Sequence, residues 1–460
     1  MTVSYTRRGF LKTLGAGIAA FATPGWLRAS SAVKPKPNII FIMADDLGYG
    51  DLGCYGQKKI LTRNVDHLAA EGMRFTQAYA GSTVCAPSRC SLMTGMHNGH
   101  NRVRDNIPHE IWLRPDDLTV AEVLKQAGYK TGGIGKWSLG NPGSWGIANY
   151  QGFDYWYGHL SQDQAHFYYP HYLWENDKVV LLGNRGNKNQ SYTHDLFTEK
   201  ALSFIEQHRE DPFFLYLAYT IPHFSDHPKD SPEHFIVPDD EPYTNKDWPQ
   251  IAKNYAAMIT RMDRDVGRIM KLIKKLGIDE NTIVFFTSDN GPYKGSPIPI
   301  EFFDSNGKLR GGKRDQYEGG IRVPMIVRWP GKVPAGQVSD QVWAFWDFLP
   351  TAAELAGLPI PKDIDGISML PALLGKKQKC HDYLYWDYGH VRKTYKQAVR
   401  MGDWKGVRNG LKAPIELYNL GDDVGETRNV ASKHPQVVSQ IEEIMRTARA
   451  DSEDYPIRGS

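Results

Sequence analysis

The residues best suited to chemistry form one short segment, Cys85-Ala86-Pro87-Ser88-Arg89. Pro87 suits the first turn of a helix, because its fixed φ fits there and its missing N–H would have no partner. Gly95 is a natural helix stop, so we expect a helix over residues 87–94 with the cysteine just before it. The helix N-terminus and the arginine would favour an anion beside the cysteine sulfur, although an isolated cysteine here could also be structural.

Charged and polar side chains follow several predicted strands at the points where the strands end. The apolar run Asn38–Met43 predicts a buried parallel strand, and Asp45 and Asp46 come directly after it. The same pattern recurs with Lys136 after 130–134, His223 after 212–219, and Asp289 with Asn290 after 282–287. Because the carboxyl ends of parallel strands meet at one edge of a sheet, we expect these side chains to gather near Cys85.

The gathered side chains would make a metal site beside an anion site. The three aspartates and Asn290 form an all-oxygen ligand set, which favours Ca²⁺ or Mg²⁺ over zinc. Three cations stand beside this set without a structural reason to cluster: Arg89, Lys136 and Lys313. A metal ion and several cations around one nucleophile would hold a dense, multi-oxygen anion and its developing charge.

The elements that must position these residues predict an α/β fold, with a large mixed, mostly parallel sheet flanked by helices. Expected helices cover residues 64–71, 119–126, 193–208, 251–273 and 345–356, and further strands cover 73–80 and 323–328. We expect residues 141–192, rich in aromatic and polar side chains, to form long loops over the sheet edge that carry substrate contacts.

The pattern changes after residue 374. Short strand-like segments at 383–386, 397–401, 404–407 and 417–420, followed by a helix over 435–450, predict a smaller α+β domain with an antiparallel sheet. The expected organisation is therefore a leader over 1–32, a catalytic domain over 33–374 and a C-terminal subdomain over 375–460.

The leader resembles a twin-arginine export signal. Arg7 and Arg8 precede Phe10 and Leu11, an apolar run follows over 14–22, and small residues at 30–32 suit cleavage. We therefore expect export by the Tat translocase to the periplasm or outside the cell. The leader holds four basic residues and no acidic one, so the formal charge of +3 belongs to it and the remainder is close to neutral. That balance argues against nucleic acid as a partner, and no later stretch predicts a stable membrane anchor.

Four cysteines are too few for a disulfide scaffold. If Cys85 is modified, at most one bridge can form among Cys54, Cys90 and Cys380. Their spacing does not match a zinc site.

An ordered set of motifs resembles the type I, formylglycine-dependent sulfatases, which are arylsulfatase-like members of the alkaline-phosphatase-like superfamily. The motifs are Ala-Asp-Asp-Leu-Gly at 44–48, Cys-Ala-Pro-Ser-Arg at 85–89, Gly-Lys-Trp at 135–137, Pro-His at 222–223, Ser-Asp-Asn-Gly at 288–291, and Gly-Lys with Tyr-Glu-Gly-Gly at 312–320. The resemblance covers nearly the whole chain after the leader.

The resemblance implies a role for each matching residue. Cys85 would become formylglycine (3-oxoalanine) through a formylglycine-generating enzyme, and would complete a calcium site made by Asp45, Asp46, Asp289 and Asn290. Arg89 would stabilise the formylglycine, Lys136 and Lys313 would bind sulfate oxygens, and His223 with Lys313 would help to protonate the leaving alcohol.

The hydrated aldehyde explains why the family modifies its cysteine. One hydroxyl attacks sulfur and displaces the alcohol, and the second then loses its proton to expel sulfate and restore the aldehyde. The expected reaction is hydrolysis of a sulfuric ester, releasing inorganic sulfate from a sulfated substrate, with a saccharide as the expected class.

One position departs from the family pattern. A histidine often stands two residues after the lysine of Gly-Lys-Trp, whereas this chain has Ser138, and serine is a poor general base at neutral pH. His166 is a candidate substitute and a further substrate-binding candidate, or else a plain loop histidine. His97 and His100 are also either site residues or ordinary surface histidines.

Two rival functions remain open at this point. One is a phosphatase or phosphodiesterase of the same superfamily, whose members typically use Ser or Thr with two zinc ions. The other is a catalytically silent, glycan-binding relative, which an unmodified Cys85 and the absence of Ca²⁺ would favour.

We predict that protein made in a host with the modifying enzyme carries an aldehyde in place of the Cys85 thiol. Mass spectrometry of the peptide that contains residue 85 measures this conversion. Active enzyme that contains only cysteine at this position would contradict the mechanism.

Overall fold

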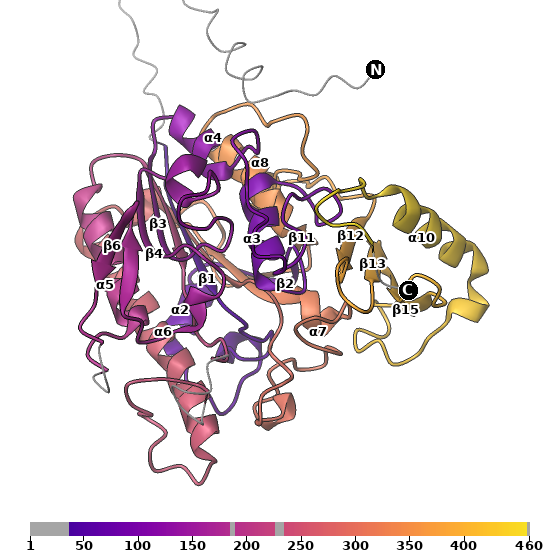
Figure 1. Cartoon of the computed structure of the whole chain (residues 1–460), viewed down its shortest axis with the longest axis horizontal. Coiled ribbons are helices and arrows are strands. Elements are labelled where there is room, and N and C mark those ends of the chain that lie inside the picture. Colours follow the sequence, from indigo (N-terminus) through magenta and orange to yellow (C-terminus); the bar gives the residue numbers. More distant parts are fainter. Residues whose placement is uncertain (1–35, 185–188, 226–233, 458–460) are drawn as a thin grey trace, which may run out of the picture.

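The computed structural model describes residues 36–184, 189–225 and 234–457, so the predicted leader over 1–32 lies outside the described residues. Eleven strands form its central sheet (Figure 1). They are β1 (Asn38–Ala44), β2 (Met73–Tyr79), β3 (Lys130–Lys136), β4 (Tyr155–His159), β5 (Tyr172–Glu175), β6 (Lys178–Leu181), β7 (Phe213–Ala218), β8 (Thr282–Ser288), β9 (Arg322–Arg328), β10 (Gln337–Ser339) and β11 (Trp343–Ala344).

The strand order is β10-β2-β9-β8-β1-β7-β3-β4-β5-β6, with β11 also paired to β2. The five strands from β8 to β4 run parallel, and their registers are continuous. β9 is antiparallel to both β2 and β8, and β5 and β6 form an antiparallel edge beside β4. This confirms the predicted fold class of a mixed, mostly parallel sheet.

Helices cover both faces of the sheet, and each face buries its own hydrophobic cluster. One face packs against α2 (Arg63–Ala70), α5 (Thr193–Gln207) and α6 (Gln250–Lys275); the other packs against α3 (Cys85–Thr94), α4 (Val120–Gln126) and α8 (Phe348–Leu355). Met258 and Met262 of α6 are buried, as the apolar stripe of that helix predicts. The central strands are therefore held from both sides.

A separate four-stranded antiparallel sheet lies toward the C-terminus, on the right in Figure 1. It consists of β12 (Leu384–Tyr388), β13 (Lys396–Met401), β14 (Trp404–Asn409) and β15 (Glu416–Asn419), and α10 (Pro435–Thr447) packs on it. Two four-residue helices, α7 (Glu318–Ile321) and α9 (Leu370–Leu373), precede it in the chain. The predicted antiparallel sheet is confirmed, and the domain boundary at residue 374 stays a prediction.

Two local predictions were wrong, and a third was incomplete. The segment 141–192 is loop over most of its described length, as predicted, but it also contains β4, β5 and β6; β5 and β6 have only four residues each, too few to produce a clear alternation. Cys85 is the first residue of α3 and does not precede it. Lys136 is the last residue of β3 and does not follow it, because Gly135 continues the strand predicted over 130–134 and has no side chain to show the alternation in the sequence.

Within the described part of the chain, no helix has the length and hydropathy needed to cross a bilayer. All four cysteines lie in that part and carry free thiols.

Gly135 sits next to Lys136 with a φ of +110°, and a Cβ there would lie 1.9 Å from the carbonyl oxygen of Ala218. We predict that Gly135→Ala lowers the free energy of unfolding by about 3 kcal/mol or more, because strain and backbone overlap add. Gly128→Ala is the matched control, since Gly128 also has a positive φ of +82° but no atom within 4 Å of a Cβ. Urea denaturation measures both; equal losses would contradict the close approach of β3 and β7.

Candidate active site

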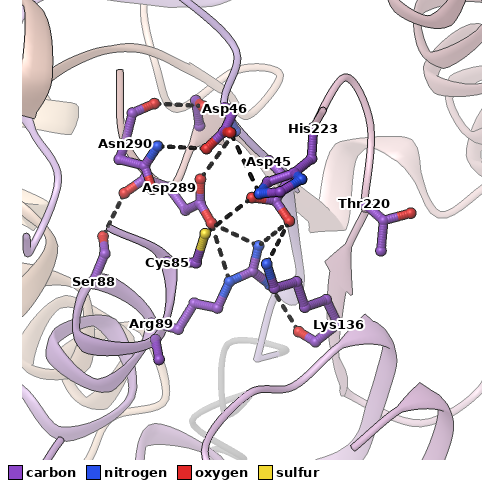
Figure 2. A network of polar contacts seen from close by, with 12 residues as sticks. Asp45, Asp46, Cys85, Ser88, Arg89, Lys136, Thr220, His223, Asp289 and Asn290 are labelled. Atoms are coloured by element: carbon purple, nitrogen blue, oxygen red, sulfur yellow. Dashed lines mark hydrogen bonds and ion pairs between the residues drawn. The ribbon is translucent and has the colours of Figure 1, made fainter. Parts of the chain in front are cut away.

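Cys85 is fully buried and lies among Asp45, Asp289 and Arg89 (Figure 2). Its position follows from α3, which begins at this residue after the extended Val84 and ends at Gly95 with a φ of 72°. The Cys85 Sγ donates to Asp45 Oδ1 at 3.3 Å and accepts from Lys313 Nζ at 3.5 Å. The thiol therefore contacts one predicted metal ligand and one predicted sulfate-binding lysine.

The predicted metal ligands come together from two neighbouring strands, β1 and β8. The backbone N–H of Asp46 donates to Asp289 Oδ1 at 3.2 Å, and Asn290 Nδ2 donates to Asp46 Oδ1 at 2.7 Å. Asp46 has a φ of 65°, a left-handed conformation that aspartate tolerates better than most residues. These four ligand residues are at most 2 % exposed.

Two buried cations hold the floor of the site. The Arg89 guanidinium donates to Asp289 Oδ2 through Nε at 3.1 Å and through Nη2 at 2.8 Å, and lies 3.5 Å from Asp45 Oδ2. Its Nη1 donates to the carbonyl oxygen of Lys136 at 2.7 Å. The Lys136 Nζ donates to Asp45 Oδ2 at 2.8 Å. Arg89 thus joins α3, β3 and β8, and Figure 2 shows it beneath the cysteine.

Lys313 and His223 form the opposite wall. The Lys313 Nζ lies 2.7 Å from Asp46 Oδ1 and 2.8 Å from Asp46 Oδ2, and contacts His223 Nε2 at 2.9 Å. The His166 ring stacks on the His223 ring, with 4.2 Å between centroids and 15° between planes. The structure therefore brings His166 to the site.

Burial and mutual repulsion dominate the titration of the carboxylates. Burial raises the pKa of Asp289 to about 7, with the charges of Asp45 and Asp46 acting in the same direction against Arg89. Burial also raises the pKa of Asp46, although Lys313 opposes this. Burial would raise the pKa of Asp45 too, but Lys136 and the other cations hold it well below its usual value. The local cations therefore compensate the three carboxylates unequally.

The donor set fits a hard divalent cation. Asp45, Asp46 and Asp289 supply carboxylate oxygens, and Asn290 Oδ1 is buried without a hydrogen-bond partner among the described residues. Asp45, Asp46, Cys85 and His223 also place ligand atoms within 4.8 Å of one another. A bound cation would satisfy an unpartnered buried amide oxygen beside crowded carboxylates.

Ser138, the departure from the family pattern, has a φ of 66° and a buried Oγ without a hydrogen-bond partner among the described residues. His97 and His100 lie elsewhere: their rings stack on each other at 4.2 Å, and His100 Nδ1 contacts Asp365 at 3.0 Å.

Sequence reasoning missed two polar residues of the site. Ser88 Oγ donates to the Asp289 carbonyl at 2.5 Å and ties α3 to β8. His159 is fully buried at the end of β4 in register with Lys136, and neither of its ring nitrogens has a hydrogen-bond partner among the described residues. Recognising β4 as a strand would have placed His159 at the carboxyl edge.

Comparison with known families agrees with this geometry. The Sulfatase family profile matches residues 37–358, and the profile for the N-sulphoglucosamine sulphohydrolase C-terminal region matches residues 311–451. The chain belongs to the sulfatase family. Its relatives include an N-acetylgalactosamine-6-O-sulfatase of Bacteroides thetaiotaomicron, 31% identical with 90% of this chain and 93% of the relative covered. The dog N-acetylgalactosamine-6-sulfatase is 35% identical, with 94% and 83% covered.

Solved structures agree with the sulfatase fold. Ps i-CgsB in complex with k-i-k-neocarrahexaose superposes with a TM-score of 0.77 at 31% identity, covering 91% of this sulfatase and 93% of that chain. Its family and its relatives indicate that this sulfatase hydrolyses sulfuric esters.

We predict that a divalent cation stabilises the folded protein through this ligand set. At a concentration 100-fold above the dissociation constant, the free energy of unfolding should rise by about 2.7 kcal/mol. Thermal unfolding after chelation, with Ca²⁺ or Mg²⁺ added back, measures the gain. Asn290→Ala should reduce it, whereas Asn149→Ala, in the helical turn that precedes β4, should not. Equal gains in all three proteins would contradict the assignment.

Proposed function

We propose that this sulfatase releases inorganic sulfate from a sulfated saccharide, with a hydrated formylglycine made from Cys85 as the nucleophile and Ca²⁺ as the bound metal. The observation that carries this proposal is the position of Cys85. Its sulfur lies between a predicted metal ligand, Asp45, and a predicted sulfate-binding cation, Lys313.

An unmodified thiol is poorly suited to be the nucleophile here. Burial and the charge of Asp45 raise the pKa of Cys85 to about 12, so very little thiolate would exist at neutral pH. A geminal diol at the same position would instead offer one hydroxyl for attack on sulfur and a second for the release of sulfate. This supports the conversion of the cysteine.

The cations of the site suit the binding of a sulfate group. Lys136 and Lys313 are buried ammonium groups that approach from the floor and from the opposite wall. Burial lowers their pKa values, but their aspartate partners outweigh this and keep the pKa values raised. Both would present N–H donors to sulfate oxygens, with a geometry already fixed before substrate binds. Arg89 keeps Asp289 and Asp45 in place from beneath.

The metal would supply positive charge next to the nucleophile and lower the pKa of its hydroxyl. Asp45, Asp46, Asp289 and Asn290 would hold it. We propose Ca²⁺ because an all-oxygen set of protein side chains suits the larger ion, whereas Mg²⁺ usually keeps several waters.

Lys313 and His223 would serve the leaving group. Burial and the charge of Lys313 hold the pKa of His223 well below its usual value, so its neutral ring can accept a hydrogen bond at Nε2 from Lys313 Nζ, at 2.9 Å, while Lys313 keeps its proton. The pair would place one acidic proton beside the bridging oxygen. His166 stacks on His223 and would fix its ring plane, and it is our candidate for the function that Ser138 does not supply.

A saccharide substrate is supported by the relatives. Two are N-acetylgalactosamine 6-sulfatases, and a structural neighbour is described in complex with D-glucosamine-2-N,6-O-disulfate. The twin-arginine leader supports the proposal that the enzyme acts in the periplasm or outside the cell, after maturation by a formylglycine-generating enzyme.

A phosphatase or phosphodiesterase of the same fold is the second candidate, because a phosphonate monoester hydrolase shares the fold with a TM-score of 0.63. The donor set is mostly oxygen, which argues against a two-zinc site. Comparing kcat/KM for 4-nitrophenyl sulfate and 4-nitrophenyl phosphate separates the two, and a preference for the phosphate ester would overturn the proposal.

We predict that Cys85→Ala abolishes sulfate release, with a loss of at least about 10⁴-fold in kcat, because no nucleophile remains. Cys90→Ala is the matched control, since Cys90 is equally buried in the same helix but Cys85 alone contacts Asp45. Sulfate release by ion chromatography and circular dichroism measure activity and folding. A folded Cys85→Ala variant with full activity would refute the assignment.

A further inference from the structure

Arg314 directly follows Lys313, the lysine that contacts Cys85, and its side chain is exposed. Its φ is 74°, a left-handed conformation that arginine rarely adopts. Such backbone strain persists only where surrounding contacts impose it, and it is concentrated at functional sites.

Contacts on both sides impose this conformation. The Arg314 N–H donates to the carbonyl oxygen of Thr83 at 3.0 Å, two residues before Cys85. The Arg314 carbonyl oxygen accepts from Lys396 Nζ at 3.0 Å, and Lys396 begins β13 of the C-terminal sheet. The Arg314 backbone is therefore held between Thr83 and the C-terminal sheet, and this fixes the position of its Cα and Cβ atoms.

The Arg314 charge is not neutralised locally. The neighbouring carboxylate, Asp315, is bound by Lys294 and lies 3.7 Å from Lys396 Nζ. Among the described residues, no carboxylate lies within ion-pair distance of the Arg314 guanidinium. The guanidinium carbon lies 5.9 Å from the centroid of the Tyr293 ring. An exposed arginine with a fixed backbone and no acidic partner, beside a catalytic lysine, can bind an anion from solution.

Tyr388, at the end of β12, supplies a second observation. Its side chain is 3 % exposed, and its hydroxyl has no hydrogen-bond partner among the described residues. Burial and Asp105 raise the pKa of this hydroxyl, against the positive charges of Arg392, Arg314 and Lys313. The Arg392 guanidinium lies 5.1 Å from the Tyr388 ring and is itself paired with Asp105 at 2.6 Å. Tyr388 is the register partner of Lys396 across β12 and β13, and Lys396 Nζ donates to the Arg314 carbonyl oxygen at 3.0 Å. The unpartnered hydroxyl and the unpaired guanidinium therefore belong to residues joined through Lys396.

We propose that Arg314, with the Tyr388 hydroxyl, forms a second anion subsite that binds a second negatively charged group of the substrate. This deepens the proposed function and rests on it. The substrate class is then a saccharide that carries, beside the sulfate to be hydrolysed, another anionic group such as a carboxylate on a neighbouring sugar. Lys313 binds the sulfate to be hydrolysed, and Arg314 selects substrates that carry the second anionic group.

The test compares two disaccharides that differ by one charge. One is the unsaturated, 6-sulfated chondroitin disaccharide, and the other is the same disaccharide with its carboxylate reduced to an alcohol. We expect the matured wild-type enzyme to bind the carboxylate form about tenfold more tightly, as one charge-assisted hydrogen bond provides. Arg314→Gln should remove this preference, and Arg314→Lys should restore part of it, while kcat for 4-nitrophenyl sulfate changes by less than about twofold.

Titration calorimetry with both disaccharides is carried out with Arg314 and its variants in the Cys85→Ala background, which does not hydrolyse them, so the binding ratio contains no heat of reaction. Lys412→Gln is the control, because Lys412 is an equally exposed cation on the β14–β15 connection. A wild-type enzyme without a preference, or an Arg314→Gln variant that weakens both disaccharides equally, would overturn the subsite. Failure of wild-type enzyme to release sulfate from any ester would instead overturn the proposed function, so the two failures are distinguishable.

Discussion

The site depends on the balance between three buried carboxylates and the cations that surround them. Asp45, Asp46 and Asp289 are almost fully removed from water, where unpaired charge is strongly unfavourable. Arg89, Lys136 and Lys313 each bind one or two of them. The raised pKa of Asp46 and of Asp289 indicates that this compensation is incomplete, which leaves room for one more positive charge.

The parallel sheet brings these charged residues together. The strands β1, β7, β8 and β3 share one carboxyl edge, so residues far apart in the chain reach a common point without long loops. The core on both faces holds the strands, and hydrogen bonds from Arg89 and Ser88 tie α3 to that edge. The donors are therefore oriented before a substrate arrives, which is the condition for electrostatic catalysis.

Much of this arrangement could be predicted from the sequence, because buried parallel strands produce uninterrupted apolar runs. Asp45, Asp289 and His223 were placed correctly at one edge, since each follows such a run. β4 was missed because its residues mix aromatic side chains with Gly158, and His159 at its end was missed with it.

Other features of the site could not be predicted because they depend on tertiary contacts. The stacking of His166 on His223 joins two loops whose approach no local pattern encodes. The conformation of Arg314 is imposed by Thr83 and by Lys396, and the latter belongs to the C-terminal sheet. The backbone of Ser138 is left-handed, although serine carries no signal for it.

A crystal structure of the matured enzyme with bound sulfate tests the central claim most directly. The account predicts density for a formylglycine diol at residue 85, with sulfate oxygens near Lys136 and Lys313. It also predicts a cation with oxygen ligands at about 2.3–2.6 Å from Asp45, Asp46, Asp289 and Asn290. An intact Cys85 thiol in demonstrably active crystals, or sulfate bound elsewhere, would contradict it.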